Sequence, residues 1–328
     1  MKVLFIERKN ADTPSIETVF RRLAEGIKDL GLIPEFEKLP FGNGARGILQ
    51  NLSRYRPRPA DVYHITGHVQ YIALVLPRDK TILTVHDLRI LEIRKGLRRA
   101  FLKKLLFDWP VRRLNWVTTI SEKTRSDLVR MTGVDPDKIV VIGNPLPNEY
   151  KFDRRPFNEA LPVFLHIGTG PHKNLERVIQ AVDGLAVHLR VIGELSPEQS
   201  RMLDAADLEF SNVRSLPAEQ MLQEYRKADA VVFCSLFEGF GLPIIEAQAI
   251  GRPVITSSIS PMAEVAGDGA VLVDPSSVVE IRSAIKRVMA DAALRAEMVE
   301  KGQKNVERFR LNKIAEQYAD LYRKVGGS

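Results

Sequence analysis

Residues 229–246 read DAVVFCSLFEGFGLPIIE. Five consecutive apolar residues, 230–234, predict a strand that is buried on both faces, because a half-exposed strand would alternate with polar residues. Gly239-Phe240-Gly241 predicts a turn, and a helix is expected to begin near Leu242 or Pro243. A buried strand followed by a glycine-containing turn and a helix is the building unit of a parallel sheet that is covered by helices.

The same alternation of apolar runs and helical patterns continues along the chain. The expected strands are 2–7, 61–66, 81–86, 115–120, 138–142, 163–168, 188–193, 229–235, 253–257 and 270–273. A helical apolar stripe runs from Ile16 to Leu30 and ends at Gly31, with Thr13 as its cap and Pro14 in its first turn. A second helix is expected from Lys173 to Gly184. The alternation predicts an α/β fold with doubly wound parallel sheets.

The polar segment 148–161 interrupts this pattern, and the alternation resumes after it. A chain of 328 residues suits two domains. We therefore expect an N-terminal domain over 1–155 and a C-terminal domain over 156–310. Residues 311–328 are expected to form a C-terminal helix that packs back on the N-terminal domain.

The composition narrows the class of protein. Apolar residues make up 45% and charged residues 27% of the chain, which is typical of a globular domain and excludes a disordered one. The net charge of +7 indicates an anionic partner. The single Cys234 excludes an intrachain disulfide and predicts a reducing, cytoplasmic location. The sequence has no apolar run of about 18 residues, so no membrane-spanning helix is expected.

A ligand site is expected where strand 229–235 ends, since open α/β sheets bind ligands beyond the carboxyl ends of their strands. Gly239 and Gly241 allow the backbone to approach a ligand closely, and the start of the next helix offers unpaired N–H groups to an anion. Glu238 lies beside that helix start and Glu246 about one turn inside it, where carboxylates could accept hydrogen bonds from sugar hydroxyls. The alternative is that Glu238 is a loop residue and Glu246 only a favourable charge near the helix start.

Glu238 and Glu246 form an E-x7-E pair within FEGFGLPIIEAQAIGRPVITSSIS, which is followed by PMAEVAGDGAVLVDP. This run over 229–275 resembles glycosyltransferase family 4, whose members are retaining enzymes of the GT-B fold. Shorter matches lie in the expected order at Thr84–Leu88, Thr119–Glu122, Val141–Pro145 and His166–Asn174. The resemblance implies two Rossmann-like, doubly wound domains that face each other across a cleft, the second of which binds a nucleotide-sugar.

The resemblance also implies roles for individual residues. Glu246 would hold the ribose hydroxyls, Glu238 would hold the transferred sugar, and Lys173 would neutralise the departing diphosphate. The implied donor-binding residues are Gly168, Thr169, Gly170, Lys173, Leu216, Glu238, Gly239, Phe240, Gly241, Leu242 and Glu246. Lys173 also fits from the residues alone, because it follows a glycine-containing turn where a helix is expected to begin; the alternative is a solvated first-turn lysine.

The sequence departs from the family pattern at one donor-site position. Many members have an arginine where this chain has Thr169. Lys173 and helix N-termini would then suffice for the diphosphate, or another basic residue would serve. No cofactor and no metal are expected, since Asp135-Pro136-Asp137 lies between a helix and a strand and is typical of a turn.

In the first domain, His86 ends an expected strand and corresponds to a histidine near the reacting sugar in the family. Together with Lys173 and Glu238 it completes the expected catalytic set, as a residue that orients the sugar or the acceptor. The alternative is a structural histidine at a strand end. His64 and His68 could contact the acceptor or be structural, and His166 is expected to be structural.

Residues 89–113 carry nine basic side chains, with Leu97, Phe101, Leu105 and Trp109 at helical spacing. A basic amphipathic helix suits an anionic membrane surface. The expected contact residues are Arg94, Lys95, Arg98, Arg99, Lys103 and Lys104. The alternative is an ordinary helix whose apolar face covers the sheet. The sequence shows no nucleic-acid-binding motif, so no nucleic-acid partner is expected.

These observations predict a metal-independent retaining glycosyltransferase, cytoplasmic or peripheral on the inner face of the membrane. The expected donor is a nucleoside-diphosphate sugar, first GDP-mannose and next a UDP-sugar. The expected acceptor is a saccharide or lipid-linked saccharide in polysaccharide or O-antigen assembly. The alternatives are a non-catalytic nucleotide-sugar-binding or scaffold subunit, a GT-B-fold nucleotide-sugar epimerase or hydrolase, and a peripheral membrane-binding module.

Overall fold

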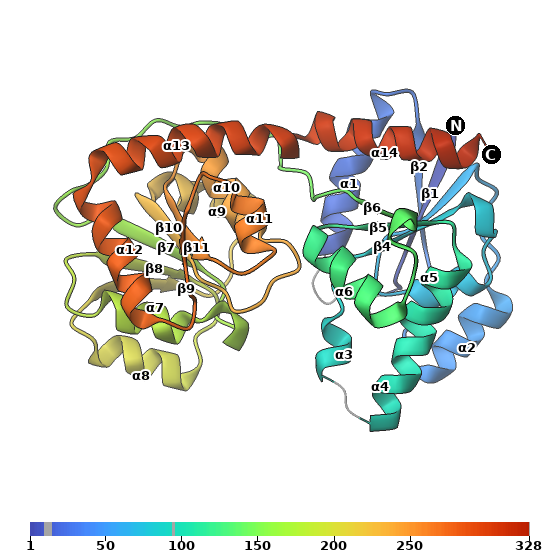
Figure 1. The fold of residues 1–328 in the computed structure, drawn as a ribbon, viewed down its shortest axis with the longest axis horizontal. Helices are drawn as coiled ribbons and strands as arrows, with labels where there is room; N and C mark the ends of the chain where they lie inside the picture. Colours follow the sequence, from blue (N-terminus) through green and yellow to red (C-terminus); the bar gives the residue numbers. More distant parts are fainter. Residues whose placement is uncertain (10–14, 94–95, 328) are drawn as a thin grey trace. The chain divides into compact units, whose positions relative to one another are not determined.

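The computed structural model describes residues 1–9, 15–93 and 96–327. Two compact units make up the chain (Figure 1): the first comprises Met1–Pro145 with Leu311–Ser328, and the second comprises Leu146–Arg310. Each unit is an α/β layer structure with its own parallel six-stranded sheet. The two doubly wound sheets confirm the predicted fold class.

The first unit has the strand order β2-β1-β3-β4-β5-β6, and all of its strand pairs are parallel. Its strands are β1 (Lys2–Glu7), β2 (Ile33–Lys38), β3 (Val62–Ile65), β4 (Thr81–Val85), β5 (Trp116–Thr119) and β6 (Ile139–Val141). Its helices are α1 (Ser15–Lys28), α2 (Ala45–Arg54), α3 (Arg89–Ile93), α4 (Gly96–Lys103), α5 (Trp109–Arg113), α6 (Glu122–Thr132) and α14 (Leu311–Gly326). Thr13 and Pro14, the expected start of the first helix, lie outside the described residues.

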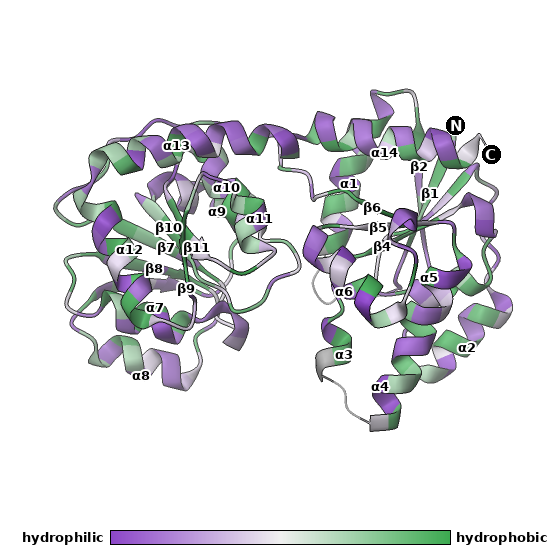
Figure 2. Ribbon diagram, viewed as in Figure 1, coloured by the Kyte–Doolittle hydropathy of each residue, from purple (hydrophilic) through white to green (hydrophobic). Residues whose placement is uncertain are grey.

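The last helix of the chain, α14, belongs to the core of the first unit. Its apolar side chains share one buried cluster with strand β1 and helix α1, and it lies beside α1 (Figure 1). Buried His64 adds a polar connection, with its ring nitrogens 2.7 Å from the Tyr322 hydroxyl and 2.7 Å from the Thr84 hydroxyl. Hydrophobic and hydrophilic residues are interspersed along α14 (Figure 2), as expected for a helix with one buried face.

The second unit has the strand order β12-β11-β10-β7-β8-β9, also parallel throughout. Its strands are β7 (Val163–Ile167), β8 (His188–Ile192), β9 (Glu209–Val213), β10 (Ala230–Phe233), β11 (Val254–Ser257) and β12 (Val271–Val273). Its helices are α7 (Leu175–Val182), α8 (Pro197–Ala205), α9 (Ala218–Lys227), α10 (Leu242–Ile250), α11 (Met262–Ala266), α12 (Val278–Ala290) and α13 (Ala292–Val306). This is the strand order of dinucleotide-binding folds. The chain adds strands toward one edge of the sheet from β7 to β9 and toward the other edge from β10 to β12, so the strand order reverses between the parallel neighbours β7 and β10.

All ten strands expected from apolar runs are present, but the sequence reading missed β2 and β9. Both are edge strands of their sheets, and their sequences IPEFEK and EFSNV carry polar residues that are only partly buried. Because one side of an edge strand remains open to water, it does not need the continuous apolar run of a central strand.

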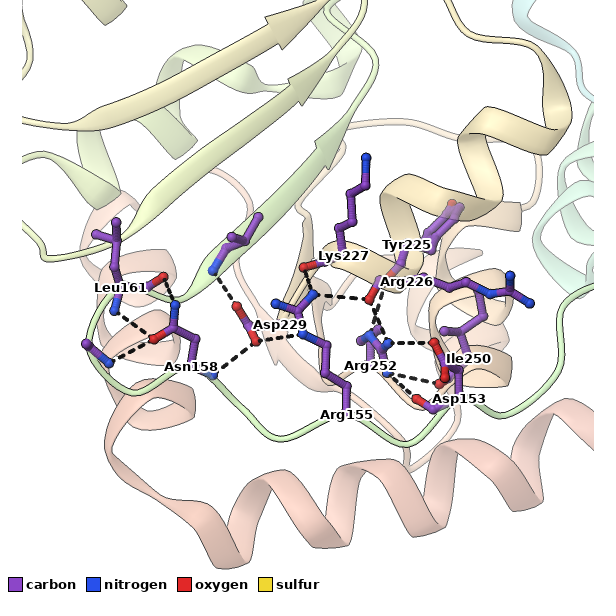
Figure 3. A network of polar contacts seen from close by, with 12 residues as sticks. Asp153, Arg155, Asn158, Leu161, Tyr225, Arg226, Lys227, Asp229, Ile250 and Arg252 are labelled. Atoms are coloured by element: carbon purple, nitrogen blue, oxygen red, sulfur yellow. Dashed lines mark hydrogen bonds and ion pairs between the residues drawn. The ribbon is translucent and has the colours of Figure 1, made fainter.

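The segment before β7 is fixed to the second unit by buried polar contacts (Figure 3). The carboxylate of Asp229 accepts hydrogen bonds from the backbone N–H groups of Asn158, at 3.1 Å, and Val163, at 2.8 Å. Arg252, only 4% exposed, donates to the carbonyl oxygen of Asp153 at 2.7 Å. The second unit therefore begins at Leu146, ten residues before the expected boundary at 155/156.

Candidate donor site in the second unit

The reversal point between β7 and β10 brings two turns together at the carboxyl ends of these neighbouring strands. One turn, residues 168–173, follows β7, and the other, residues 234–241, follows β10. The backbone N–H of Leu236 donates to the carbonyl oxygen of His172 at 2.8 Å, which joins the turns directly. This is the position at which open α/β sheets bind ligands.

Lys173 and Glu238 meet at this point. The Lys173 ammonium donates to a carboxylate oxygen of Glu238 at 2.6 Å, and the two side chains are only 18% and 14% exposed. The same ammonium lies 4.7 Å from the centre of the Phe233 ring, a cation–π contact from the end of β10. The structure thus places two of the three expected catalytic side chains in direct contact.

The turn around Lys173 has a conformation that few residues could adopt. Gly168 has φ +90°, and a Cβ there would lie 2.8 Å from Cε of Lys173. Asn174 has φ +64° and is buried, and its side-chain amide donates to the carbonyl oxygens of Cys234, at 2.9 Å, and Pro275, at 2.7 Å. Because Asn174 is left-handed, α7 begins at Leu175 and not at Lys173 as expected.

Helix α10 begins at Leu242, as predicted, directly after Gly241 with φ +108°. Phe240 is buried, and its ring meets the edge of Phe309 at 5.5 Å, so its aromatic side chain anchors the turn. The start of α10 therefore presents its positive dipole end at the same edge of the sheet as Lys173. The start of α10 and the Lys173 ammonium, which is paired with Glu238, are thus two positive groups at this edge that could face an anion.

Glu246 lies in α10, where its carboxylate accepts a hydrogen bond from the Tyr225 hydroxyl at 2.6 Å. Tyr225 comes from α9, is fully buried, and meets the ring of Tyr150 at 5.6 Å. Burial, followed by the neighbouring Glu246 charge, raises the pKa of Tyr225 well above its ordinary value. The hydroxyl therefore stays protonated at neutral pH and orients the Glu246 carboxylate.

Thr169 does not stand in for the arginine of the family pattern, because its side chain has a local contact. Its hydroxyl donates to the carbonyl oxygen of Glu194 at 2.5 Å, and its own carbonyl accepts from the Gln199 side chain at 2.8 Å. These bonds tie the turn after β7 to the loop after β8. Gly170 precedes the 3-10 turn Pro171–Lys173, and half-buried Leu216 follows the edge strand β9.

His86 belongs to the first unit, directly after β4. It is 8% exposed, and its Nε2–H donates to the carbonyl oxygen of Thr66 at 2.6 Å. Burial lowers the pKa of His86 to about 4, so the ring is neutral at pH 7. A Cβ at Gly67 would lie 2.9 Å from the His86 ring, which shows how closely the chain after β3 covers this histidine.

The basic segment differs from a sheet-covering helix. Leu97 is 91% exposed and Phe101 59% exposed on α4, whereas Leu105 is buried. Arg98, Arg99 and Lys104 are exposed, while Lys103 pairs with Asp108 at 2.7 Å. Arg94 and Lys95 lie outside the described residues.

Within 1–9, 15–93 and 96–327, no helix is long and apolar enough to cross a membrane. Over the same residues, no group of three or more His, Cys, Asp or Glu side chains is placed to hold a metal ion. Asp135 caps a 3-10 turn by accepting from the backbone N–H of Asp137 at 3.0 Å, as its sequence suggests.

The sequence reading missed two residues of this site. Asn174 is the last residue of the segment His166–Asn174. Asparagine tolerates left-handed backbone, so its position next to the expected helix start could have indicated that the helix begins after it. Tyr225 is on another helix and 21 residues from Glu246, with no short-range pattern that connects them. Only the packing of α9 beside α10 reveals this pair.

Two models of known protein families match the chain. The model described as "Glycosyl transferases group 1" matches residues 148–305, and the model "Glycosyltransferase Family 4" matches residues 9–149. The two matches together span both units of the chain. The chain belongs to glycosyltransferase family 4.

Among curated proteins, the chain is similar to the O-antigen chain mannosyltransferase RfbU of Salmonella typhimurium, with 33% identity over 221 residues. That match covers 65% of this chain and 62% of the Salmonella protein, which is less than two thirds of the relative's length. The O-antigen chain mannosyltransferase B of Escherichia coli is 26% identical over 75% of this chain and 70% of its own length.

Solved structures confirm the GT-B fold. Sucrose-phosphate synthase from Thermosynechococcus elongatus superimposes with a TM-score of 0.78 at 18% identity, over 100% of this chain and 99% of its own. HepE from Anabaena, solved with UDP-glucose, gives a TM-score of 0.73 at 17% identity, over 99% of this chain and 100% of its own. At these identities the likeness concerns the fold.

Proposed function

We propose that this protein is a glycosyltransferase that moves a sugar from a nucleoside-diphosphate sugar to a saccharide acceptor. The observation that carries the proposal is the 2.6 Å contact between Lys173 and Glu238 at the reversal point of the second sheet. In this pair, Lys173 is a cation that could bind a diphosphate, and Glu238 is a carboxylate that could accept hydrogen bonds from sugar hydroxyls. Both lie beside the start of α10.

Each group has a defined part in the proposed reaction. The Lys173 ammonium and the start of α10 stabilise negative charge as the diphosphate leaves, and in a poorly hydrated site such a cation is worth more than in water. Once a phosphate oxygen takes the ammonium, Glu238 is available to accept a hydrogen bond from the transferred sugar. Glu246, oriented by Tyr225, accepts hydrogen bonds from the ribose hydroxyls.

The proposed reaction retains the configuration of the sugar and uses no metal. The acceptor hydroxyl attacks the anomeric carbon on the face from which the diphosphate departs, and a diphosphate oxygen takes the acceptor proton. This route requires no side-chain nucleophile. Lys173 and the α10 dipole supply the positive charge that a divalent cation supplies in other glycosyltransferases.

GDP-mannose is the first candidate donor and a UDP-sugar the second. The two O-antigen mannosyltransferase relatives support mannose and also support a saccharide or lipid-linked acceptor in polysaccharide assembly. HepE binds UDP-glucose on the same fold, which keeps the UDP-sugar in consideration.

We propose that α4 contacts an anionic membrane surface, which would place the enzyme in the cytoplasm and peripheral on the inner face of the membrane. Leu97 and Phe101 lie four residues apart and are both exposed, although a sheet-covering helix would bury them. Arg98, Arg99 and Lys104 surround them with positive charge. Each such cation adds about 1 kcal/mol near anionic lipid.

One observation favours the second candidate, a non-catalytic nucleotide-sugar-binding subunit. Thr169 is uncharged and its hydroxyl bonds the carbonyl oxygen of Glu194, so this position supplies no second cation for a leaving diphosphate. Such a subunit would bind the donor and transfer nothing.

The test is a product assay with GDP-mannose and UDP-glucose in the presence of membrane lipid extracts as acceptor source. We expect GDP release with GDP-mannose and a product whose anomeric carbon, observed by NMR, keeps the donor's α configuration. Nucleotide binding without release would establish the non-catalytic alternative. A β-linked product would overturn the retaining mechanism.

A further inference from the structure

A groove in the second unit lies at the opposite edge of the sheet from Lys173 and Glu238. It is lined by residues that precede strands β10 and β11, by the segment 152–157, and by helix α13. Its volume is about 710 Å³, within the range of about 300–1,000 Å³ that small-molecule sites occupy. No step of the proposed transfer uses this groove.

One wall of the groove is apolar and aromatic. Phe152 is 51% exposed, and its ring lies close to Gly251, where a Cβ would come within 2.5 Å of the ring. Ala296 and Val299 of α13 line the groove as well. A half-exposed aromatic ring held in a fixed place is a surface on which a flat ligand can stack.

The rest of the lining is rich in arginine. Four arginines, 154, 155, 252 and 295, line the groove together with Asp229 and Glu300. Arg252 donates to backbone carbonyl groups and pairs with Asp153 at 3.4 Å. Arg155 donates to the carbonyl oxygens of Arg226 and Lys227, and its Nε lies 4.0 Å from Asp229 (Figure 3), so these contacts hold Arg155 in place at the groove.

Two of these guanidinium groups differ in how they are held. Arg295 stacks over the Phe157 ring at 4.1 Å and donates to Glu159 at 3.1 Å. Arg154 is exposed and has no hydrogen-bond or ion-pair partner within the described part of the chain. Guanidinium groups bind phosphate through two parallel hydrogen bonds, and a phosphate carries a charge of about −1.5 to −2. Arg154 is therefore the arginine of this lining that a phosphate can pair with directly.

We infer that this groove is a second ligand site, which binds a small aromatic molecule that carries a phosphate. The ring stacks on Phe152 and against Val299, and the phosphate pairs with Arg154 and the outer face of Arg155. The ligand would thereby clamp the segment 152–157 to α13. The inference is independent of the donor site, which lies at the carboxyl ends of the strands.

Calorimetry with 1-naphthyl phosphate tests the inference on the full chain. We expect saturable binding at one site, while 1-naphthol and inorganic phosphate each bind more weakly. Phe152→Ala and Arg154→Gln should each lower the affinity about fivefold or more, which corresponds to about 1 kcal/mol. Both side chains are exposed, so the variants should fold, and melting curves verify this.

Two controls separate this groove from other sites. Arg287→Gln removes an exposed arginine of α12 outside the groove and should leave the affinity unchanged. Glu246→Ala should also leave it unchanged; loss of binding in that variant would show that the probe occupies the donor site and would overturn the inference. Absence of saturable binding to the wild type would overturn it as well. So would an affinity of the Phe152 and Arg154 variants that equals the affinity of the wild type.

Discussion

The Lys173 ammonium and the Glu238 carboxylate are separated by 65 residues of sequence and by 2.6 Å in the structure. The pair forms because β7 and β10 are neighbours at the reversal point of the sheet, and each strand is followed by a turn that projects outward. With Glu246 and the start of α10, it brings the groups of the proposed nucleotide-sugar site together from separate parts of one unit.

Lys173→Met should lower the transfer rate by about 10²–10³, the range found when a preorganised group that stabilises transition-state charge is removed. The methionine keeps most of the volume and loses the charge opposite Glu238. Steady-state kinetics with GDP-mannose measures the effect. Lys304→Met, an exposed lysine of α13, is the matched control and should retain full activity. Equal rates in the two variants would remove Lys173 from the mechanism.

Tyr225→Phe should weaken nucleoside-diphosphate affinity, because the hydroxyl that orients Glu246 is lost while the ring and its packing remain. Removing one partner of a buried hydrogen bond costs about 1–3 kcal/mol, or roughly 5- to 150-fold if all of it appears in binding. Calorimetry with GDP measures it. Tyr318→Phe changes a buried tyrosine of the first unit and should alter stability without altering GDP affinity. Unchanged GDP affinity in Tyr225→Phe, or weakened GDP affinity in Tyr318→Phe, would contradict the orienting role of Tyr225.

Stability should fall as the pH drops from 7 to 5.5. Burial lowers the pKa of His64 to about 3 and the pKa values of His86 and His166 to about 4. These histidines are neutral when folded, whereas the unfolded chain takes up protons near pH 6.5, so their stabilisation is complete above that pH and is lost as the pH falls toward the folded values.

The slope of that fall can be measured by urea unfolding at several pH values. Each histidine contributes up to about 1.4 kcal/mol per pH unit. His64→Asn should be less stable at pH 7, because its bonds to Tyr322 and Thr84 are lost, and its stability should depend less steeply on pH. An unfolding free energy that is constant between pH 7 and 5.5 would show that these rings take up protons at the same pH in the folded protein as in the unfolded chain, which would contradict their lowered pKa values.

Replacement of Leu97 and Phe101 by serine should reduce co-sedimentation with vesicles that contain anionic phospholipid. The exposed pair provides apolar area that the headgroup region would bury, and Arg98 and Lys104 provide attraction that high salt should screen. Leu49→Ser, at a leucine that is 67% exposed on α2, is the control. Binding that depends equally on Leu49, or that is the same for neutral vesicles, would rule out α4 as a specific contact.

Apolar runs were sufficient to predict every central strand and the edge strands β6 and β12, but not the edge strands β2 and β9. Strands such as 230–233 are buried on both faces and must be apolar, so their composition reveals them. The edge strands β2 and β9 pair on one side only and tolerate polar residues such as Glu35 and Asn212. Their presence follows from the completed sheet and not from any local signal.

The candidate site shows the same limit. The glycine turns and the E-x7-E pair mark Gly241, Glu238 and Glu246 in the sequence, because turn and helix-start chemistry is local. The contact with Lys173 and the support from Tyr225 depend on strand order and helix packing, which no local window contains. The exposure of Leu97 and Phe101 could not be predicted either. Their helical spacing is the same in a helix that covers a sheet and in a helix that binds a membrane surface.

The most direct test of the donor site is calorimetric titration of GDP and UDP into the wild-type protein and into Glu246→Ala. Thermal unfolding of the same samples provides a check, because a ligand at 100 times its dissociation constant stabilises the folded protein by about 2.7 kcal/mol. We predict that one of the two nucleotides binds the wild type and that the variant binds it at least about tenfold more weakly, the loss expected for about 1.4 kcal/mol. Equal affinity in both proteins, or no binding of either nucleotide at millimolar concentration, would contradict the assignment of this edge of the sheet as the donor site.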